Sequence, residues 1–277
     1  MLFNSIPFLV FLPLFLAGFA LLRGRGRLAW TLAGSYLFYA WWDWRFLGLI
    51  LLSTAVDYTV GLRLGTTDDP RARKRWLVLS VATNLGVLGF FKYAGFFADS
   101  LVAAARTVGM EPGTMTLDVV LPVGVSFYTF QTMSYTLDLY RDRIEVEKSL
   151  LRFATFVAFF PQLVAGPIVR AAHLLPQLRQ GPRWTRDGLV IGTGLVLLGF
   201  AKKVAVADSL APVVDRVFAE PALLGGPMLV VGVVFYAFQI YCDFSGYSDI
   251  AIGLGRIMGF RFPWNFDRPY FARSFSE

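Results

Sequence analysis

Residues 233–258 read VVFYAFQIYCDFSGYSDIAIGLGRIM, an apolar stretch that a polar patch interrupts. Within it, Asp243, Ser245, Tyr247 and Asp249 stand between apolar residues. A charged side chain inside a bilayer costs about 2.5–3.5 kcal/mol on insertion scales, so it usually faces a water-filled cavity, a partner or a substrate path. The patch therefore predicts the wall of a functional cavity.

The composition of the whole chain is that of a membrane protein. Of its 277 residues, 56% are hydrophobic and only 16% are charged, and the mean hydropathy is positive. Several windows of 18 or more residues are almost free of charge, which is long enough for a helix to cross a bilayer. Membrane lipid is therefore an expected partner.

The net charge and the scarcity of cysteine and histidine exclude other classes. The formal charge is +7, but positive-inside topology explains basic connections between spans more simply than nucleic acid does, so no nucleic-acid partner is expected. Cys242 is the only cysteine and His173 the only histidine. These counts exclude an intrachain disulfide and argue against a metal site, so no metal is expected. We interpret His173 as an ordinary loop residue rather than a catalytic base.

Hydropathy predicts an all-α, polytopic transmembrane fold with about seven spans and one re-entrant or broken helical element. The broken element is expected at residues 153–169, where Pro161, Gly166 and Pro167 interrupt the helix. If this segment crossed the bilayer, the basic loop at 170–186 would fall outside, against the charge rule. The spans are expected at residues 3–22, 28–40, 46–62, 76–97, 119–140, 188–207 and 228–258.

The charges of the connections orient these spans. Basic connections follow the first and third spans, whereas residues 98–118 carry more acidic than basic side chains. The positive-inside rule therefore predicts an external N-terminus and cytoplasmic Arg-rich connections. Residues 208–220 are then expected to form an external loop. We interpret Lys202 and Lys203 as snorkelling side chains, with donor phosphates as an alternative ligand.

Five stretches of the chain carry a more specific signal than hydropathy. They read SFYTFQTMSYTLDLYR (126–141), FFPQLVAGPIVR (159–170), GFAKKVAVADSL (199–210), YCDFSGYSDIAIGLG (241–255) and GFRFPWNFDRPY (259–270). Together they resemble the membrane-bound O-acyltransferase family, and they look most like its alginate O-acetyltransferase branch. Because the resemblance covers nearly the whole chain, residues 1–277 are expected to form a single membrane domain of this family, multi-pass in the inner (plasma) membrane of a bacterial cell.

The resemblance also implies a reaction. It implies transfer of acetyl groups from a cytoplasmic thioester donor, such as acetyl-CoA, to hydroxyls of an exported, alginate-like polysaccharide, with no bound cofactor. A periplasmic or extracellular acetylation partner is expected on the same ground. Such a reaction requires a base for the hydroxyl, stabilisation of the oxyanion and a passage in which donor and acceptor meet.

The family's catalytic residue is expected outside this sequence. In the family, the SFSE stretch that ends here at Glu277 is followed within a few residues by the histidine held to be catalytic. The resemblance therefore assigns no catalytic residue within residues 1–277. The chain is expected to be the N-terminal part of the family's domain, to lack its C-terminal portion and to be inactive alone.

Polar interruptions of the spans supply the other candidate site residues. Asp243 and Asp249 are six residues apart, so they share one helical face only if Gly246 bends the helix. Each polar group can line the passage or hydrogen-bond a neighbouring helix, and for Ser245 and Tyr247 we favour the second interpretation. The cavity-lining candidates are Asp243, Ser245, Tyr247, Asp249, Gln131, Tyr135, Asp138, Gln162 and Asn265. The donor-binding candidates are Arg170, Arg179 and Arg183, which positive-inside topology also explains without a ligand.

Three alternatives stay open. Within the same family, the chain could transfer D-alanine from a carrier protein to teichoic acid. As a member of another class, it could be a transporter, which commonly shows paired broken helices in two related halves. No such pairing is visible in the sequence. Lastly, a chain without the histidine could serve as a scaffold for partner proteins.

Overall fold

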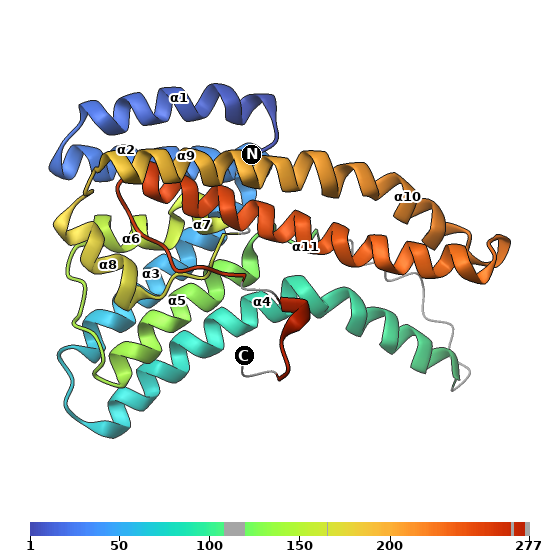
Figure 1. The fold of residues 1–277 in the computed structure, drawn as a ribbon. Helices are drawn as coiled ribbons and strands as arrows, with labels where there is room; N and C mark the ends of the chain where they lie inside the picture. Colours follow the sequence, from blue (N-terminus) through green and yellow to red (C-terminus); the bar gives the residue numbers. More distant parts are fainter. Residues whose placement is uncertain (108–119, 165, 267–268, 275–277) are drawn as a thin grey trace.

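The described part of the chain is built from helices. The computed structural model describes residues 1–107, 120–164, 166–266 and 269–274, which form helices and loops without a strand (Figure 1). The prediction of an all-α membrane protein is confirmed. The helices are α1 (Ile6–Leu21), α2 (Gly24–Asp43), α3 (Leu47–Leu64), α4 (Pro70–Thr107), α5 (Val125–Tyr140), α6 (Leu150–Ala158), α7 (Phe160–Leu163), α8 (Ala171–Gln180), α9 (Arg186–Phe200), α10 (Asp208–Ala219) and α11 (Gly226–Ile257).

Shorter turns connect some of these helices. The 3-10 turn η1 (Trp44–Phe46) joins α2 to α3, and the π-helical turn η2 (Ala201–Ala207) joins α9 to α10 without a break. The 3-10 turns η3 (Pro221–Leu223) and η4 (Pro269–Phe271) lie before α11 and in the C-terminal tail.

Among the described residues, four helical segments are long and apolar enough to cross a membrane by length and composition. α1 is apolar but shorter. Five of the expected spans fall in the four long segments, one falls on α1 and one on α5, which begins only at Val125 after Pro122 and Gly124. The number of crossings therefore stays a prediction. The four segments are Gly24–Leu64, Pro70–Thr107, Arg186–Ala219 and Gly226–Ile257.

Three expected loops differ from the structure. α4 continues to Thr107, so the loop expected from residue 98 starts later, and residues 108–118 lie outside the described residues. Residues 208–219 form α10 rather than an external loop, and residues 171–180 of the basic loop form α8. These predictions were wrong because mean hydropathy does not separate an amphipathic helix, whose charges lie along one face, from a polar loop.

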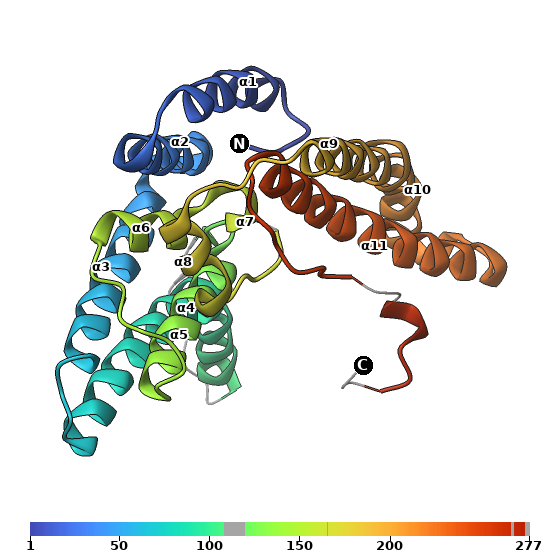
Figure 2. The same ribbon diagram turned by 60° about the vertical axis from the view of Figure 1, so that its left-hand side comes forward.

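The broken element consists of two short helices in the middle of the molecule. α6 ends at Ala158, Phe159 leaves helical geometry with φ −58° and ψ 106°, and α7 has a proline in its first turn. Figure 2 shows α7 between the α3–α5 side and α11, with α6 beside α2 and α3. The predicted break is confirmed, whereas its re-entrant path stays a prediction.

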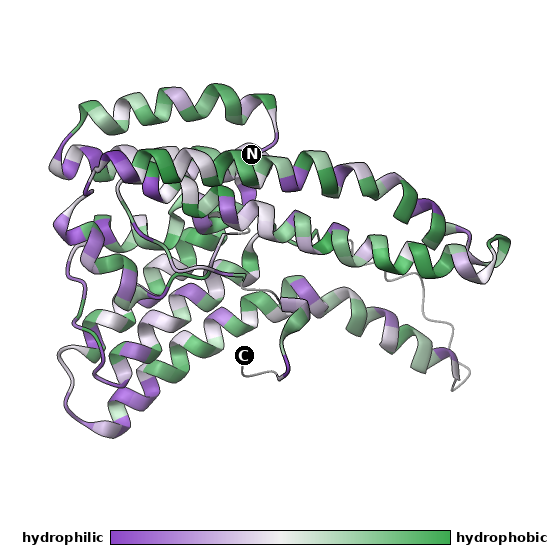
Figure 3. Cartoon of the chain, viewed as in Figure 1, coloured by the Kyte–Doolittle hydropathy of each residue, from purple (hydrophilic) through white to green (hydrophobic). Residues whose placement is uncertain are grey.

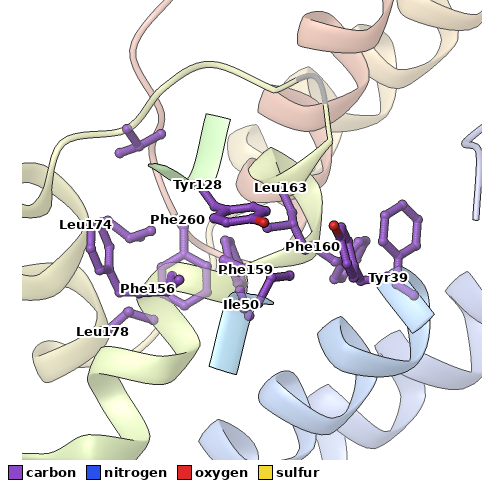
Figure 4. Packing of buried hydrophobic residues seen from close by; sticks show 14 of the residues in the cluster. Tyr39, Ile50, Tyr128, Phe156, Phe159, Phe160, Leu163, Leu174, Leu178 and Phe260 are labelled. Carbon is purple, nitrogen blue, oxygen red and sulfur yellow. The ribbon is translucent and has the colours of Figure 1, made fainter. Parts of the chain in front are cut away.

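Phenylalanine rings fill the space between α1, α2 and α7. The ring centroid of Phe160 lies 4.9 Å from that of Phe15, 5.4 Å from that of Phe11 and 5.3 Å from that of Phe38. Figure 4 shows Phe160 beside Phe159, Leu163 and two tyrosines. In a bilayer, rings of this kind hold helices together mainly by van der Waals packing, because lipid is as apolar as they are.

A polar network joins α3, α4 and α5. The side chain of Asp57 is fully buried and accepts hydrogen bonds from Ser80 Oγ at 2.6 Å and from Asn84 Nδ2 at 2.9 and 3.1 Å. Asn84 Oδ1 accepts from Ser53 Oγ at 2.6 Å, and Ser80 Oγ lies 3.0 Å from Thr136 Oγ1. The carboxylate therefore bonds three helices together through neutral donors.

Hydrophobic and hydrophilic residues are unevenly distributed along the chain (Figure 3). Hydrophobic side chains cover the outer faces of the long helices, as lipid-facing helices require. Exposed examples are Val78, Phe90 and Phe96 on α4, and Val230, Val233 and Phe238 on α11. Hydrophilic residues gather at the end of the molecule where the Arg-rich connections lie.

Candidate functional site

α9 and α11 touch each other backbone to backbone. A Cβ added to Gly199 would lie 2.5 Å from the Gly246 carbonyl oxygen, and one added to Gly253 would lie 2.6 Å from the Gly192 carbonyl oxygen. Gly192 and Gly199 are seven residues apart on α9, and Gly246 and Gly253 are seven residues apart on α11. The same helix pair therefore has two close contacts, about two helical turns apart. Small residues allow this approach between membrane helices. α11 continues through Gly246 as one helix. Because Gly246 has no side chain, α9 can approach α11 closely at this point.

The π-helical turn η2 aims two consecutive lysines at α11. Lys202 Nζ lies 2.6 Å from Asp249 Oδ2, and Lys203 Nζ lies 2.6 Å from Asp243 Oδ1. Lys203 Nζ also lies 2.8 Å from Asp208 Oδ1 at the start of α10. The interpretation of both lysines as snorkelling side chains is therefore wrong. Asp249 is buried and needs a compensating charge, which Lys202 supplies, and Lys203 pairs with the more exposed Asp243.

Other parts of the chain meet at the same place. Asn4 Nδ2 donates to Asp208 Oδ2 at 3.3 Å, and the ring of Tyr247 lies 5.6 Å from that of Phe3. Asn265 Nδ2 donates to Ser248 Oγ at 3.0 Å, which ties the C-terminal tail to α11. We call this group of residues, with the two lysines and their acids, the lysine–aspartate patch.

Asp243, Asp249 and Ser245 in the patch differ in how exposed their side chains are. The Asp243 side chain is 45% exposed and that of Asp249 only 10%. Ser245 Oγ is buried and has no hydrogen-bond partner among the described residues. Neither acid lines any of the three cavities described below. The cavity-wall role of Asp243, Ser245, Tyr247, Asp249 and Asn265 stays a prediction.

The remaining cavity-lining candidates lie in two other places. Gln131 and Gln162 both donate to the Phe156 carbonyl oxygen, at 2.6 and 3.0 Å, beside the broken element. Gln162 Oε1 is buried and has no partner among the described residues. Tyr135 and Asp138 lie towards the C-terminal end of α5, where the Tyr135 hydroxyl accepts from the Glu147 N–H at 3.1 Å. The structure thus divides the nine candidates among three locations.

Arg179, a predicted donor-binding residue, holds a buried acid. Its Nε lies 2.8 Å from Glu147 Oε2, while Arg152 Nη2 lies 3.0 Å from Oε1 of the same carboxylate. Burial alone would raise the pKa of the Glu147 carboxyl, but hydrogen bonds from Arg179, the Ser149 N–H and Arg152 outweigh it and leave the pKa below its ordinary value. Arg179 therefore has a structural task in the 141–149 connection.

Arginines line two adjoining cavities at this end of the molecule. The larger has a volume of about 680 Å³, and its wall includes Arg183, Arg256 and Arg261. The smaller, of about 390 Å³, includes Arg27 and Arg179, and the two cavities share Gln180, Gly181 and Phe260. We call them the arginine cavities. Arg170 lies exposed at the N-cap of α8 and belongs to neither wall.

α8 fastens the C-terminal tail beside the larger cavity. The Arg261 carbonyl oxygen lies 2.8 Å from His173 Nε2 and accepts from Gln177 Nε2 at 2.9 Å, and the Arg261 N–H donates to Gln177 Oε1 at 2.8 Å. His173 thus holds the tail from a helix. Among the described residues, no group of three His, Cys, Asp or Glu side chains is placed to bind a metal ion.

Comparison with known proteins decides the family. The sequence model described as MBOAT, membrane-bound O-acyltransferase family, matches residues 28–277. The chain belongs to the membrane-bound O-acyltransferase family. The resemblance found in the sequence blocks is therefore confirmed, and the two lysines and their three acids lie within two of those blocks, at 199–210 and 241–255.

Relatives within the family carry three kinds of name. The chain is 45% identical over 279 residues to the probable alginate O-acetylase of Azotobacter vinelandii, covering 100% of this chain and 55% of the relative. It is 31% identical to the peptidoglycan O-acetyltransferase of Helicobacter pylori, covering 100% and 58%. It is 29% identical to the teichoic acid D-alanyltransferase of Streptococcus thermophilus, covering 56% and 39%. The chain thus spans about half the length of the first two relatives.

Several functional candidates escaped the sequence reasoning. Arg256 and Arg261 were not singled out as candidates, and the two lysines were interpreted as snorkelling side chains. The sequence did contain a signal for the contact between α9 and α11. Gly192 and Gly199 are seven residues apart, and so are Gly246 and Gly253. Matching glycine repeats on two apolar segments predict a close crossing, and a close crossing brings the lysines that follow one segment to the acids on the other.

Proposed function

We propose that this chain forms the donor side, and part of the passage, of a membrane O-acyltransferase that transfers an acetyl group from a cytoplasmic thioester to hydroxyls of an exported polysaccharide. The names of the two relatives that match its full length support an acetyl group and a polysaccharide or peptidoglycan acceptor. A multi-pass position in a bacterial inner membrane and a periplasmic acetylation partner belong to the same proposal.

The observation that carries the proposal is the pair of arginine cavities. They lie at the end that the positive-inside rule assigns to the cytoplasm, where a thioester donor such as acetyl-CoA is available. A volume of about 680 Å³ lies within the range of ligand pockets in proteins. Guanidinium groups suit phosphate because they donate two parallel hydrogen bonds, and acetyl-CoA carries several phosphates.

The four arginines differ in how well they are placed to bind the acyl donor. Arg183 is exposed, donates to Gln180 Oε1 at 2.8 Å and has further N–H groups available for a phosphate. Arg256 Nε is buried without a partner among the described residues, so a bound anion would satisfy it. Arg179 is shared with Glu147, and Arg170 stands outside both walls. We therefore rank Arg183 and Arg256 above Arg179, and Arg179 above Arg170.

The passage of the proposal runs from the arginine cavities past the broken element to the lysine–aspartate patch. Gln131 and Gln162 would line it beside α7, and the patch would line it along α11. Tyr135 and Asp138 remain candidates at the cytoplasmic end. We assign no cofactor or metal to this chain, because an acyl thioester supplies the activated group itself.

Acyl transfer in inside-out membrane vesicles tests the proposal. Vesicles that contain the full gene product and enclose an acceptor polysaccharide in their lumen receive either radiolabelled acetyl-CoA or a carrier protein charged with labelled D-alanine from outside. We expect label transfer from acetyl-CoA. Transfer from the charged carrier alone would favour the D-alanyl alternative, and transfer from neither donor would contradict the enzyme.

Arginine variants in the same assay test the donor site. Arg183→Ala should raise the KM for acetyl-CoA about tenfold and leave kcat nearly unchanged, because one charge-assisted hydrogen bond is worth about 1.5–3 kcal/mol. Arg106→Ala, which removes an exposed arginine at the far end of α4, is the matched control. Equal KM values for both variants would remove the arginine cavities from donor binding.

A further inference from the structure

A third cavity lies towards the opposite end of the molecule from the arginine cavities. It has a volume of about 360 Å³. α2 connects the two ends, since Arg27 lines an arginine cavity and Tyr39 lines the third one. Twelve residues of helix separate them, or about 18 Å at a rise of 1.5 Å per residue. The wall consists of Met1, Leu2, Ser5, Pro7, Tyr39, Trp41, Trp42, Val123 and Val164. We call it the tryptophan cavity.

Two buried hydroxyls beside this cavity lack a partner other than each other. Tyr39 is 2% exposed and Tyr128 is 1% exposed, and neither phenol oxygen has a partner in hydrogen-bond geometry among the described residues, although the two hydroxyls lie close enough to interact with each other. Their ring centroids lie 6.5 Å apart in an edge-to-face arrangement. Figure 4 shows both oxygens turned into the same space beside Leu163 and Phe160. The large majority of buried polar side-chain atoms are hydrogen-bonded in proteins, so two neighbouring hydroxyls with no partner except each other point to a ligand.

The mouth of the cavity is aromatic. Trp41 is 58% exposed and Trp42 is 43% exposed. The ring of Trp42 stacks on that of Phe46 at 5.2 Å, which holds it in place. An interfacial aromatic belt accounts for exposed tryptophans, but it does not account for two buried and unpaired phenols behind them. Large flat rings outside and hydroxyl donors inside suit a ligand with an apolar face and several hydroxyls.

We propose that the tryptophan cavity binds one sugar unit of the acceptor polysaccharide, with the C–H face of the sugar ring on Trp41 and its hydroxyls bonded to Tyr39 and Tyr128. This inference rests on the proposed function, which requires an acceptor from the outer side. The loop charges assign this end of α2 to that side. Val164 follows α7 directly, so the cavity reaches the broken element along which the passage is proposed to run. A lipid chain would leave both phenols unsatisfied, and we therefore favour the sugar.

Binding to the full gene product in lipid nanodiscs tests the inference without any turnover. The probe is a labelled, unacetylated alginate oligosaccharide, measured by equilibrium dialysis. The double variant Tyr39→Phe with Tyr128→Phe should raise Kd about tenfold, because two neutral hydrogen bonds are lost. Its fold should be preserved, since each change removes an oxygen that bonds to no described residue. Tyr36→Phe, on the same helix, is the matched control and should bind as the unmodified protein does.

Tryptophan variants supply a second pair. Trp41→Ala should weaken oligosaccharide binding at least fivefold, whereas Trp44→Ala, in the same aromatic belt but outside the cavity wall, should leave it unchanged. Equal Kd values within both pairs would overturn the inference. A lipid that leaves with Trp41→Ala in native mass spectrometry, with oligosaccharide binding intact, would also overturn it.

Kinetics separate this inference from the proposed function. In the vesicle assay, the tyrosine double variant should raise the KM for the acceptor and leave the KM for acetyl-CoA unchanged, the reverse of Arg183→Ala. Normal acceptor KM in an active enzyme would remove the tryptophan cavity and leave the acyltransferase in place. Absence of transfer by the unmodified protein, with oligosaccharide binding lost in the tyrosine variant, would remove the reaction and keep the sugar site.

Discussion

The α3–α5 side and the α9–α11 side of the molecule both bury carboxylates in apolar helices, but with opposite kinds of partner. Asp57 is fully buried and receives hydrogen bonds from the neutral side chains of Ser80 and Asn84. Asp249, on the other side, is paired with Lys202. Neutral hydrogen-bond donors suffice for Asp57, which links helices. The ion pair, in contrast, keeps both Lys202 and Asp249 charged.

The difference also separates closed from accessible polar groups. The partners of Asp57 are buried, so its network is a dry link among three helices. In the lysine–aspartate patch, the side chains of Asp243 and Asp208 are 45% and 41% exposed. We therefore interpret the α3–α5 network as a structural feature and the patch as the part of the chain that meets water or substrate.

The largest effect is expected from breaking the buried ion pair. Lys202→Met leaves Asp249 without a cation and should lower the free energy of unfolding by about 3 kcal/mol. Adding Asp249→Leu should restore most of the loss, because an apolar pair can replace a buried ion pair at little cost. Unfolding by SDS in mixed micelles measures both values. A loss below about 1 kcal/mol in the single variant would mean that the pair is solvated.

Glycine substitution compares the packing of the two sides. Gly199→Ala places a methyl group against the Gly246 carbonyl oxygen and should cost about 2 kcal/mol by forcing α9 from α11. Gly86→Ala on α4, where a Cβ meets nothing within 4 Å, is the matched control and should be neutral or slightly stabilising. Equal effects at both positions would show that the close crossing is not needed for stability.

Exchanging two residues probes the α3–α5 network. Asp57→Asn alone should lower the free energy of unfolding by about 1–2 kcal/mol, because charge-assisted hydrogen bonds are replaced by neutral ones. Combining it with Asn84→Asp restores one carboxylate and one amide, and a coupling energy of about 1 kcal/mol or more is expected in the double-mutant cycle. If the losses in stability of the two single variants simply add up in the double variant, Asp57 and Asn84 are not energetically coupled, and the account would be contradicted.

The smallest effect concerns pH at the edge of the α3–α5 side. The folded-state pKa of Glu147 lies below its ordinary value, so its bonds stabilise the protein above the unfolded-state pKa of about 4.3 and are lost as pH falls through the folded-state pKa. Thermal unfolding of the unmodified protein should therefore shift to lower temperature on acidification below about pH 4.3. In Glu147→Gln, this part of the pH dependence should disappear. An unchanged pH profile in Glu147→Gln would contradict the role of this carboxylate.

The sequence predicted what depends on local composition. Apolar windows located α1, α2, α3 and α11 to within four residues and located α4 and α9 less accurately, and Pro161 located the break between α6 and α7. The resemblance located the family. In each case, the signal lies in neighbouring residues, so it needs no knowledge of how helices pack.

The sequence did not predict side-chain contacts that depend on how one helix is rotated against another. Lys202 meets Asp249, 47 residues later, only because the π-helical turn and the glycine contacts set the rotation of α9 against α11. Asp57 was not singled out, since its partners lie on two other helices. Tyr39 and Tyr128 look like ordinary aromatic residues until burial shows that their hydroxyls are unpaired.

Cysteine accessibility tests the contrast between the two sides most directly. After Cys242→Ser removes the only cysteine, Asp243→Cys and Ser80→Cys are introduced singly and treated with a charged, water-soluble thiosulfonate. Lys203 keeps Asp208 as a partner in the first variant. We expect Asp243→Cys to react at least tenfold faster than Ser80→Cys, because the Asp243 side chain is 45% exposed and the Ser80 side chain is buried. Equally slow labelling of both cysteines would contradict a water-accessible patch on α11.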